Sequence, residues 1–169
     1  PRKNVESALR AHTLLPEALR RRFPLVLVGM HGWLTSRLEH EMKLPAVRGE
    51  VITPGYVADE DLADLYSGAC ALLYPSIYEG FGLPPLEAMA CGAPVIMSNT
   101  SSLPEVGGPA AVLHDPHNVD ALSLAMRRLV EDPQFRRERS AASLQQAAQF
   151  SWDRCARKTL TVYKNTLAA

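Results

Sequence analysis

The feature that most constrains the fold is an alternation of short apolar runs with longer stretches of helical composition. The apolar runs lie at 25–28, 51–53, 70–74 and 94–97, and each is followed by Gly, Pro or Ser. Runs of this length, bounded by turn residues, are typical of buried β-strands. The stretches between them, at 35–43, 59–67 and 83–91, are long enough for crossover helices. Because a crossover helix returns the chain to a parallel strand, the alternation predicts an α/β domain with one parallel sheet and helices on both faces.

Both ends of the chain depart from this alternation. Residues 4–15 are predicted to form a helix, yet no strand precedes them, so we expect the first strand of the sheet to lie upstream of Pro1. Near the other end, apolar residues recur at the spacing of one helical face in 122–130 and again in 152–163. Two or three extra C-terminal helices are therefore expected to close a single domain that fills residues 1–169.

Composition and charge exclude several classes of protein. Eighteen Lys and Arg balance 18 Asp and Glu, so the chain lacks the positive field that drives nonspecific nucleic-acid binding, and we expect no nucleic-acid partner. No apolar run approaches the roughly 18 residues of a membrane span. The three cysteines, Cys70, Cys91 and Cys155, form no CxxC pair. They predict neither a disulfide framework nor a zinc site, and they fit a reducing cytoplasm.

Ligands of an open parallel sheet bind at the carboxyl ends of the strands, which directs attention to the loop after the third apolar run. In that loop, Gly80 and Gly82 allow close approach of the backbone to a ligand, while Pro84 and Pro85 suit the first turn of a helix. A glycine-rich turn that leads into a helix offers free N–H groups and the positive end of the helix dipole. The segment therefore predicts a site for a phosphate or diphosphate.

Two carboxylates flank this turn, Glu79 before it and Glu87 about one turn into the predicted helix. Turn and helix place them on the order of 10 Å apart, beyond the roughly 5 to 9.5 Å that separates the acid and base of a glycoside hydrolase. They suit the two ends of an extended ligand, with sugar hydroxyls at one end and ribose hydroxyls at the other. In the alternative, both are solvated surface acids and the glycines only form a turn. The spacing alone fits both interpretations equally well.

The string PSIYEGFGLPPLEAMACGAPVI, residues 75–96, resembles the signature of retaining glycosyltransferases of family four. The resemblance extends from Lys3 to about Tyr163 and includes the segments 25–29, 54–57, 102–105 and 150–152. It implies a Rossmann-like domain that is the C-terminal, nucleotide-sugar-binding half of the glycosyltransferase B fold. The acceptor-binding N-terminal half would then be missing from this chain, and the last helix, from about 151, is expected to pack back toward it.

The resemblance implies two catalytic residues. Glu79 would contact the donor sugar and stabilise charge near the reacting carbon. Lys3 would neutralise the diphosphate, which is chemically reasonable because charge develops on the leaving phosphate in the transition state. The family's arginine, a few residues upstream of that lysine, would fall before Pro1, so the chain by itself is expected to be inactive.

The resemblance also implies the residues that bind the substrate. Glu87 would bind the ribose, Val57 would lie by the base, and the backbone of Gly80, Phe81, Gly82 and Leu83 would hold sugar and phosphate. Two further candidates follow the first apolar run, at the same edge of the predicted sheet. These are Gly29 and His31, the second of which could touch phosphate or sugar.

The implied activity is that of a retaining hexosyltransferase, which moves a sugar from a nucleoside diphosphate to an alcohol acceptor. The likeness to bacterial mannosyltransferases makes GDP-mannose the expected donor and polysaccharide or glycolipid synthesis the expected process. No cofactor and no metal are expected, because Lys3 and the helix start would balance the phosphates and no acidic cluster is present. The acceptor, a glycan or a lipid-linked glycan, would be bound by the missing half, which would also make any contact with the inner face of the membrane.

Two other hypotheses stay open, namely an epimerase or phosphorylase of the same fold and a noncatalytic nucleotide-sugar-binding module. A dinucleotide-binding domain is disfavoured because no strand is followed by Gly-x-Gly-x-x-Gly. The remaining candidates have structural explanations. Ser102 and Glu105 have the spacing of a capping box, His12 and His40 are expected on helix surfaces, His114 and His117 lack a third metal ligand, and Trp152 and Tyr163 are expected in the core.

Overall fold

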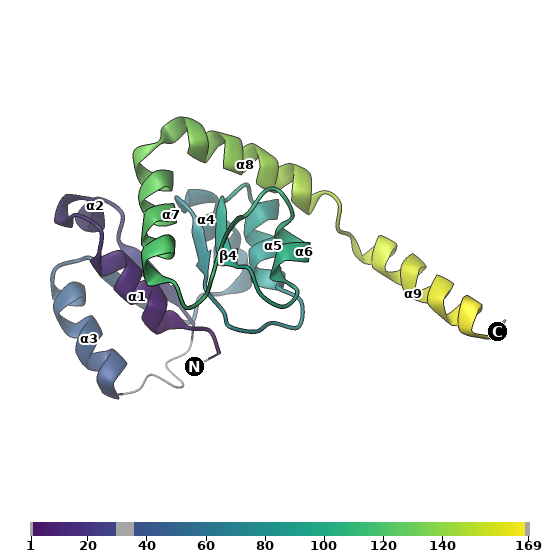
Figure 1. Ribbon diagram of the computed structural model, residues 1–169, viewed down its shortest axis with the longest axis horizontal. Coiled ribbons are helices and arrows are strands. Elements are labelled where there is room, and N and C mark those ends of the chain that lie inside the picture. Colours follow the sequence, from purple (N-terminus) through teal and green to yellow (C-terminus); the bar gives the residue numbers. More distant parts are fainter. Residues whose placement is uncertain (1, 30–35, 168–169) are drawn as a thin grey trace.

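The computed structural model describes residues 2–29 and 36–167, and its elements follow the predicted alternation (Figure 1). The strands are β1 (Leu25–Val28), β2 (Val51–Gly55), β3 (Leu72–Tyr74), β4 (Val95–Ser98) and β5 (Val112–His114). The helices are α1 (Val5–Thr13), α2 (Glu17–Arg22), α3 (Ser36–Val47), α4 (Asp59–Gly68), α5 (Leu83–Ala90), α6 (Leu103–Gly107), α7 (Val119–Glu131), α8 (Pro133–Ala147) and α9 (Trp152–Leu167). The four predicted strands are confirmed to within two residues, whereas β5 and α2 are not among the predicted elements.

All described strand pairs are parallel, but they form two separate sheets, a smaller one of two strands and a larger one of three. β1 pairs with β2, with Leu25 opposite Val51. β3, β4 and β5 pair in that order, with Leu72 opposite Val95 and Ile96 opposite Val112. In the part of the chain that the structure describes, the expected single sheet is thus divided, because no ladder joins β1 to β3. The parallel order and the crossover helices are confirmed.

The central strand of the larger sheet, β4, is covered on both faces. All four of its residues are buried, and successive side chains of a strand point to opposite faces. Val95 and Met97 pack with residues of α5 and α6, while Ile96 packs with residues of α7 and with Ala11 of α1. Figure 1 shows β4 between these two groups of helices. A continuous apolar run is what a strand covered on both faces requires.

α1 packs against both sheets and so connects them. Ala8 and Leu9 pack with residues of β1 and β2, whereas Ala11 packs with β4. The helix expected within 4–15 is confirmed. Residues of α1 thus contact both sheets, the earlier ones the smaller sheet and Ala11 the larger one.

The expectation that His12 of α1 lies on a helix surface is wrong. Its side chain is 2% exposed, and its Nε2–H donates to the carbonyl oxygen of Phe23 at 3.0 Å. Burial lowers the pKa of the His12 imidazole despite this bond. The side chain of His40, which carries the same expectation, lies outside the described residues.

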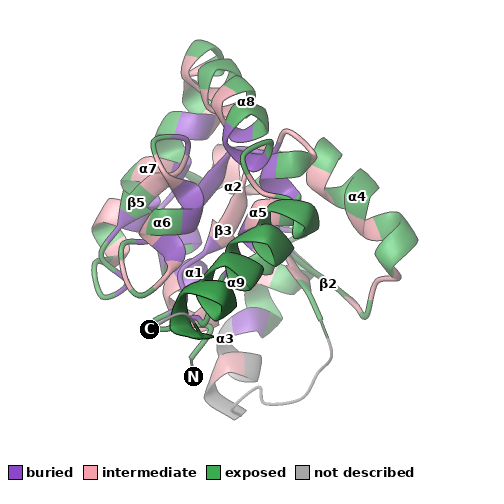
Figure 2. Ribbon diagram, turned by 90° about the vertical axis from the view of Figure 1, so that its right-hand side faces the viewer, coloured by how far each residue is buried: buried purple, intermediate pink, exposed green. Residues whose placement is uncertain are grey.

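α9 extends away from the rest of the domain (Figure 1), and none of its residues is buried (Figure 2). The expectation that Trp152 and Tyr163 belong to the core is therefore wrong, since their exposures are 80% and 63%. Helical spacing of apolar residues shows that a helix has an apolar face, but not that this chain supplies the partner for it. None of the described helices combines the length and the apolar character needed to cross a membrane.

Candidate functional site

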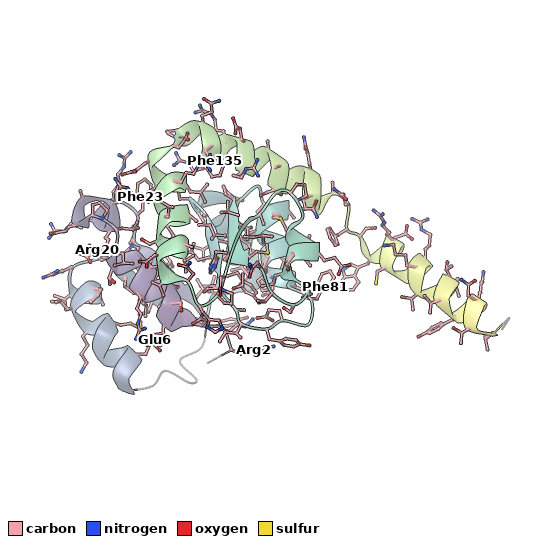
Figure 3. The ribbon with its side chains drawn as sticks, viewed as in Figure 1. Arg2, Glu6, Arg20, Phe23, Phe81 and Phe135 are labelled. Carbon is pink, nitrogen blue, oxygen red and sulfur yellow. The ribbon has the colours of Figure 1, made fainter. Side chains whose placement is uncertain are left out.

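The first described residues of the chain contact the loop after β3, at the carboxyl edge of the larger sheet. Glu79, on that loop, is 7% exposed, and its Oε1 accepts a hydrogen bond from Lys3 Nζ at 2.7 Å. Lys3 Nζ also donates to the Tyr74 hydroxyl at 2.5 Å and lies 4.6 Å from the centre of that ring. Arg2, labelled in Figure 3, places Nη1 3.7 Å from Glu79 Oε2. The fold thus pairs the two predicted catalytic residues, which are 76 positions apart in the sequence.

Asn4 holds the Lys3 segment in place. Its side-chain amide donates to the carbonyl oxygens of Pro75 and Pro116, at 3.1 and 2.8 Å. Its backbone φ of 53° lies in the left-handed region, which turns the chain from Lys3 into α1. A further bond runs from the Ile77 N–H to the Arg2 carbonyl at 2.9 Å. The role of Asn4 was missed from the sequence, where its only signal is its position at the start of a predicted helix.

Burial and ion pairing act in opposite directions on both charged groups. Burial lowers the pKa of Lys3, but its hydrogen bonds to Glu79 and Tyr74 outweigh that effect, so the pKa is raised above its ordinary value. Burial likewise raises the pKa of Glu79, but the hydrogen bond from Lys3 and the lysine charge outweigh it, so the pKa is lowered. Both groups are therefore charged at neutral pH, side by side at the mouth of the loop.

The glycine loop, residues 77–83, presents free N–H groups next to this pair. Among the described residues, no N–H from 80 to 83 donates a hydrogen bond, and the prolines at 84 and 85 have no N–H to give. Gly82 has a φ of +112°, and a Cβ at this position would lie 2.9 Å from Leu103 Cδ2. Only glycine fits there. The loop and the start of α5 can therefore bind an anion through consecutive backbone donors.

Ser102 contacts the same loop, which overturns the prediction of a capping box. It occupies the position before α6, but its hydroxyl makes no capping hydrogen bond. It donates instead to the carbonyl oxygens of Glu79 and Phe81, at 3.1 and 2.7 Å. The prediction is wrong because the carbonyl groups of a loop distant in the sequence take the Ser102 hydroxyl. Glu105, the other residue of the predicted capping box, is exposed.

Comparison with known proteins decides the family. The family described as "Glycosyl transferases group 1" matches residues 1–146. The chain belongs to this family. The O-antigen chain mannosyltransferase B of Escherichia coli is 46% identical over 164 residues, which are 97% of this chain and 43% of that protein. The serotype-specific mannosyltransferase WbdA of the same species is 41% identical over 156 residues, 90% of this chain and 19% of that protein.

A solved structure bears out the fold of this group 1 glycosyltransferase domain. Sucrose-phosphate synthase of Thermosynechococcus elongatus superposes with a TM-score of 0.78 at 30% identity, over 99% of this chain and 43% of that one. The predicted class, half of a glycosyltransferase B fold, is confirmed. The family favours the transferase hypothesis over the epimerase, phosphorylase and noncatalytic alternatives. The chain spans less than half the length of these relatives.

The residues expected at the nucleotide end of the group 1 site come from α5 and the turns after β1 and β2. Glu87 is exposed on α5, and Val57 is half-buried just before α4, which contacts α5. Burial and then the nearby Glu87 charge raise the pKa of Tyr66 to about 12. The Gly29 N–H donates to the Gly55 carbonyl at 2.9 Å, which joins the two turns. His31 lies outside the described residues.

The described residues contain no group of three or more His, Cys, Asp and Glu that could hold a metal. His114 is buried, and its Nδ1 bonds the Asp115 carbonyl oxygen at 2.8 Å, which gives it a structural partner. The three cysteines are free.

Proposed function

We propose that this chain is the donor-binding domain of a retaining mannosyltransferase, which transfers mannose from a nucleoside diphosphate to a hydroxyl of a glycan acceptor. The observation that carries the proposal is the Lys3–Glu79 pair beside the free N–H groups of residues 80–83. The arrangement offers a cation and backbone donors to a diphosphate, and a carboxylate to sugar hydroxyls, at one edge of the sheet.

In this proposal the diphosphate lies over the start of α5, where Lys3 and the loop N–H groups stabilise the charge that develops on it. Glu79 accepts hydrogen bonds from the donor sugar and stabilises positive charge at its anomeric carbon. The bond from that carbon to the phosphate oxygen breaks as a bond to the acceptor oxygen forms on the same face. The acceptor proton passes to the departing phosphate oxygen. The products are the glycoside and the nucleoside diphosphate.

The sugar and the base are inferred separately. Mannose is supported by the two relatives named as mannosyltransferases, at 46% and 41% identity. GDP is the first candidate for the nucleotide. Because Lys3 and the N–H groups supply the counter-charge, we propose that binding requires no metal, which titration with and without Mg²⁺ tests.

This chain spans 43% of the length of the E. coli mannosyltransferase B. We assign binding of the acceptor to the part of the whole protein that lies outside this chain. We assign the apolar face of α9 to contact with that part. Trp152, Leu160 and Tyr163 are 80%, 52% and 63% exposed and recur at helical spacing. A lipid-linked glycan as acceptor would bring the whole enzyme to the cytoplasmic face of a membrane.

The experiment is an NMR titration of this chain with GDP, UDP, ADP and their common sugar conjugates. Saturable shifts of the amides of Gly80, Gly82, Leu83 and Val57 with one nucleotide are expected. If none of these nucleotides shifts those amides at millimolar concentration, the proposal is wrong for this chain.

A variant sharpens the assignment of the ribose. Glu87→Ala is expected to weaken nucleotide binding roughly 10-fold, because a charged hydrogen bond is lost, without lowering the free energy of unfolding. Glu60→Ala, which removes another exposed glutamate, from the first turn of α4, is the matched control and should leave the affinity unchanged. Unchanged affinity in Glu87→Ala would remove this residue from the site.

A further inference from the structure

Three consecutive hydroxyl side chains bind the backbone of the glycine loop. Thr100 Oγ1 donates to the Ile77 carbonyl oxygen at 3.0 Å, and Ser101 Oγ accepts from the Glu79 N–H at 3.0 Å. Ser102 shares its single hydroxyl proton between the carbonyl oxygens of Glu79 and Phe81, at 3.1 and 2.7 Å. The turn at 100–102 therefore engages four backbone groups of the loop that carries Glu79.

This turn adopts a conformation that side chains disfavour. Ser101 has a φ of 51°, in the left-handed region where Cβ crowds the carbonyl oxygen. Among the described residues, the other non-glycine residue with positive φ is Asn4. Asn4 holds the Lys3 segment, and Ser101 bonds the backbone of Glu79. The disfavoured conformations therefore lie next to the two charged residues of the site, which is where strain retained for function is expected.

Ser102 fixes the direction of two N–H groups that it does not contact. The described peptide bonds are all trans, and in a trans unit the C=O and N–H point to opposite sides. Holding the Glu79 carbonyl therefore turns the Gly80 N–H away from Ser102. Holding the Phe81 carbonyl does the same to the Gly82 N–H. Both N–H groups belong to the run from 80 to 83 that has no acceptor among the described residues.

We propose that Ser102 is a positioning residue for the donor diphosphate and acts through the N–H groups of Gly80 and Gly82. This inference rests on the proposed function. A hydroxyl that orients these donors beforehand reduces the ordering cost paid when the phosphates bind. Its effect is therefore confined to ligands that carry phosphate groups.

The test compares Ser102→Ala and Ser102→Thr in titrations with GDP, UDP and ADP and with the corresponding nucleosides. Ser102→Ala is expected to weaken binding of the preferred diphosphate roughly 3- to 10-fold and to leave nucleoside affinity unchanged. Ser102→Thr keeps the hydroxyl and should restore the affinity. Ser140→Ala is the matched control, because Ser140 Oγ also donates to a distant carbonyl, that of Gly92 at 2.7 Å, beyond the other end of α5.

A second measurement needs no ligand. Residual dipolar couplings of the Gly80 and Gly82 N–H vectors in the free chain should change in Ser102→Ala and stay unchanged in Ser140→Ala. Unchanged couplings, or an equal loss of affinity for diphosphates and nucleosides, would overturn the inference. If the unaltered chain binds none of the nucleotides, the proposed function and the role toward the donor both fail, while the couplings still decide whether Ser102 orients the loop.

Discussion

Two glutamates of the described residues, Glu50 and Glu79, are buried and paired with a cation, and the two sites differ in what surrounds the cation. In the structural pair, Arg20 Nε donates to Glu50 Oε2 at 2.8 Å; in the site pair, Lys3 Nζ donates to Glu79 Oε1 at 2.7 Å. Both glutamates are buried. The arginine side chain is 15% exposed and the lysine side chain 48% exposed. Arg20 also lies far from Arg2 and the site in Figure 3.

The remaining hydrogen bonds explain what each pair is for. Arg20 Nη1 also donates to the carbonyl oxygens of Thr13 and Leu15, at 3.3 and 2.5 Å, so its guanidinium joins the end of α1 to α2. Lys3 uses two of its three ammonium donors, on Tyr74 and Glu79. An enclosed cation bonded on several sides holds the fold together. A cation at the surface with a donor to spare can take a new anionic partner, and this is the difference between a structural ion pair and a binding site.

The largest effect expected from breaking the site pair is on catalysis. In the whole enzyme, Glu79→Gln should lower kcat roughly 10²- to 10³-fold with a smaller change in the KM for donor, because charge stabilisation is lost chiefly in the transition state. Steady-state kinetics with varied donor concentration measures both constants. Glu50→Gln is the comparison and should leave the kcat of the folded enzyme unchanged. A loss confined to KM would show that Glu79 only positions the donor.

The free energy of unfolding should fall more when the structural pair is broken than when the site pair is broken. Arg20→Met leaves the Glu50 carboxylate buried without its cation and should lower the free energy of unfolding by about 3 kcal/mol. Lys3→Met should cost less than about 1 kcal/mol, because its side chain is half exposed and Arg2 still lies 3.7 Å from the Glu79 carboxylate. Urea unfolding at pH 7 measures both, with Arg21→Met, which breaks the exposed pair with Glu17, as the control. Equal losses in the first two variants would abolish the distinction between the pairs.

The smallest expected effect is a pH dependence of stability near the structural pair. Burial lowers the pKa values of His12 and His114, so below pH 6.5 the unfolded chain binds more protons than the folded one. Stability should therefore fall as pH drops from about 6.5 toward the lowered values, by less than about 1.4 kcal/mol per pH unit for each histidine. The lowered pKa values of Glu50 and Glu79 add losses only below their ordinary value of 4.5.

Urea unfolding at several pH values between 7 and 5 tests this, with His12→Gln as the variant that cannot take up a proton. Its amide can still donate to the Phe23 carbonyl, so its stability curve should be flatter than that of the unaltered chain. An unchanged slope would show that His12 has the same pKa in the folded and the unfolded chain.

Strands and helices were predictable where residues near one another in the sequence decide the outcome. The apolar run of β4 is typical of a strand covered on both faces, and the glycines at 80 and 82 indicated a loop able to bind an anion. β5 was not predicted because its three residues are too few to show a period. The expected exposure of the His12 side chain was wrong because its hydrogen-bond partner, Phe23, is eleven residues away in the sequence.

The sequence by itself determined the α/β alternation, the glycine loop and the presence of Glu79 at a strand end, since each depends on local composition and spacing. Only the tertiary structure decided that Lys3 meets Glu79, that Asn4 holds the lysine segment and that Ser102 serves the loop instead of a helix cap. Those contacts join residues 21 to 112 positions apart. They form because parallel strand pairing and the packing of α1 bring their backbones to one edge, which no local pattern encodes.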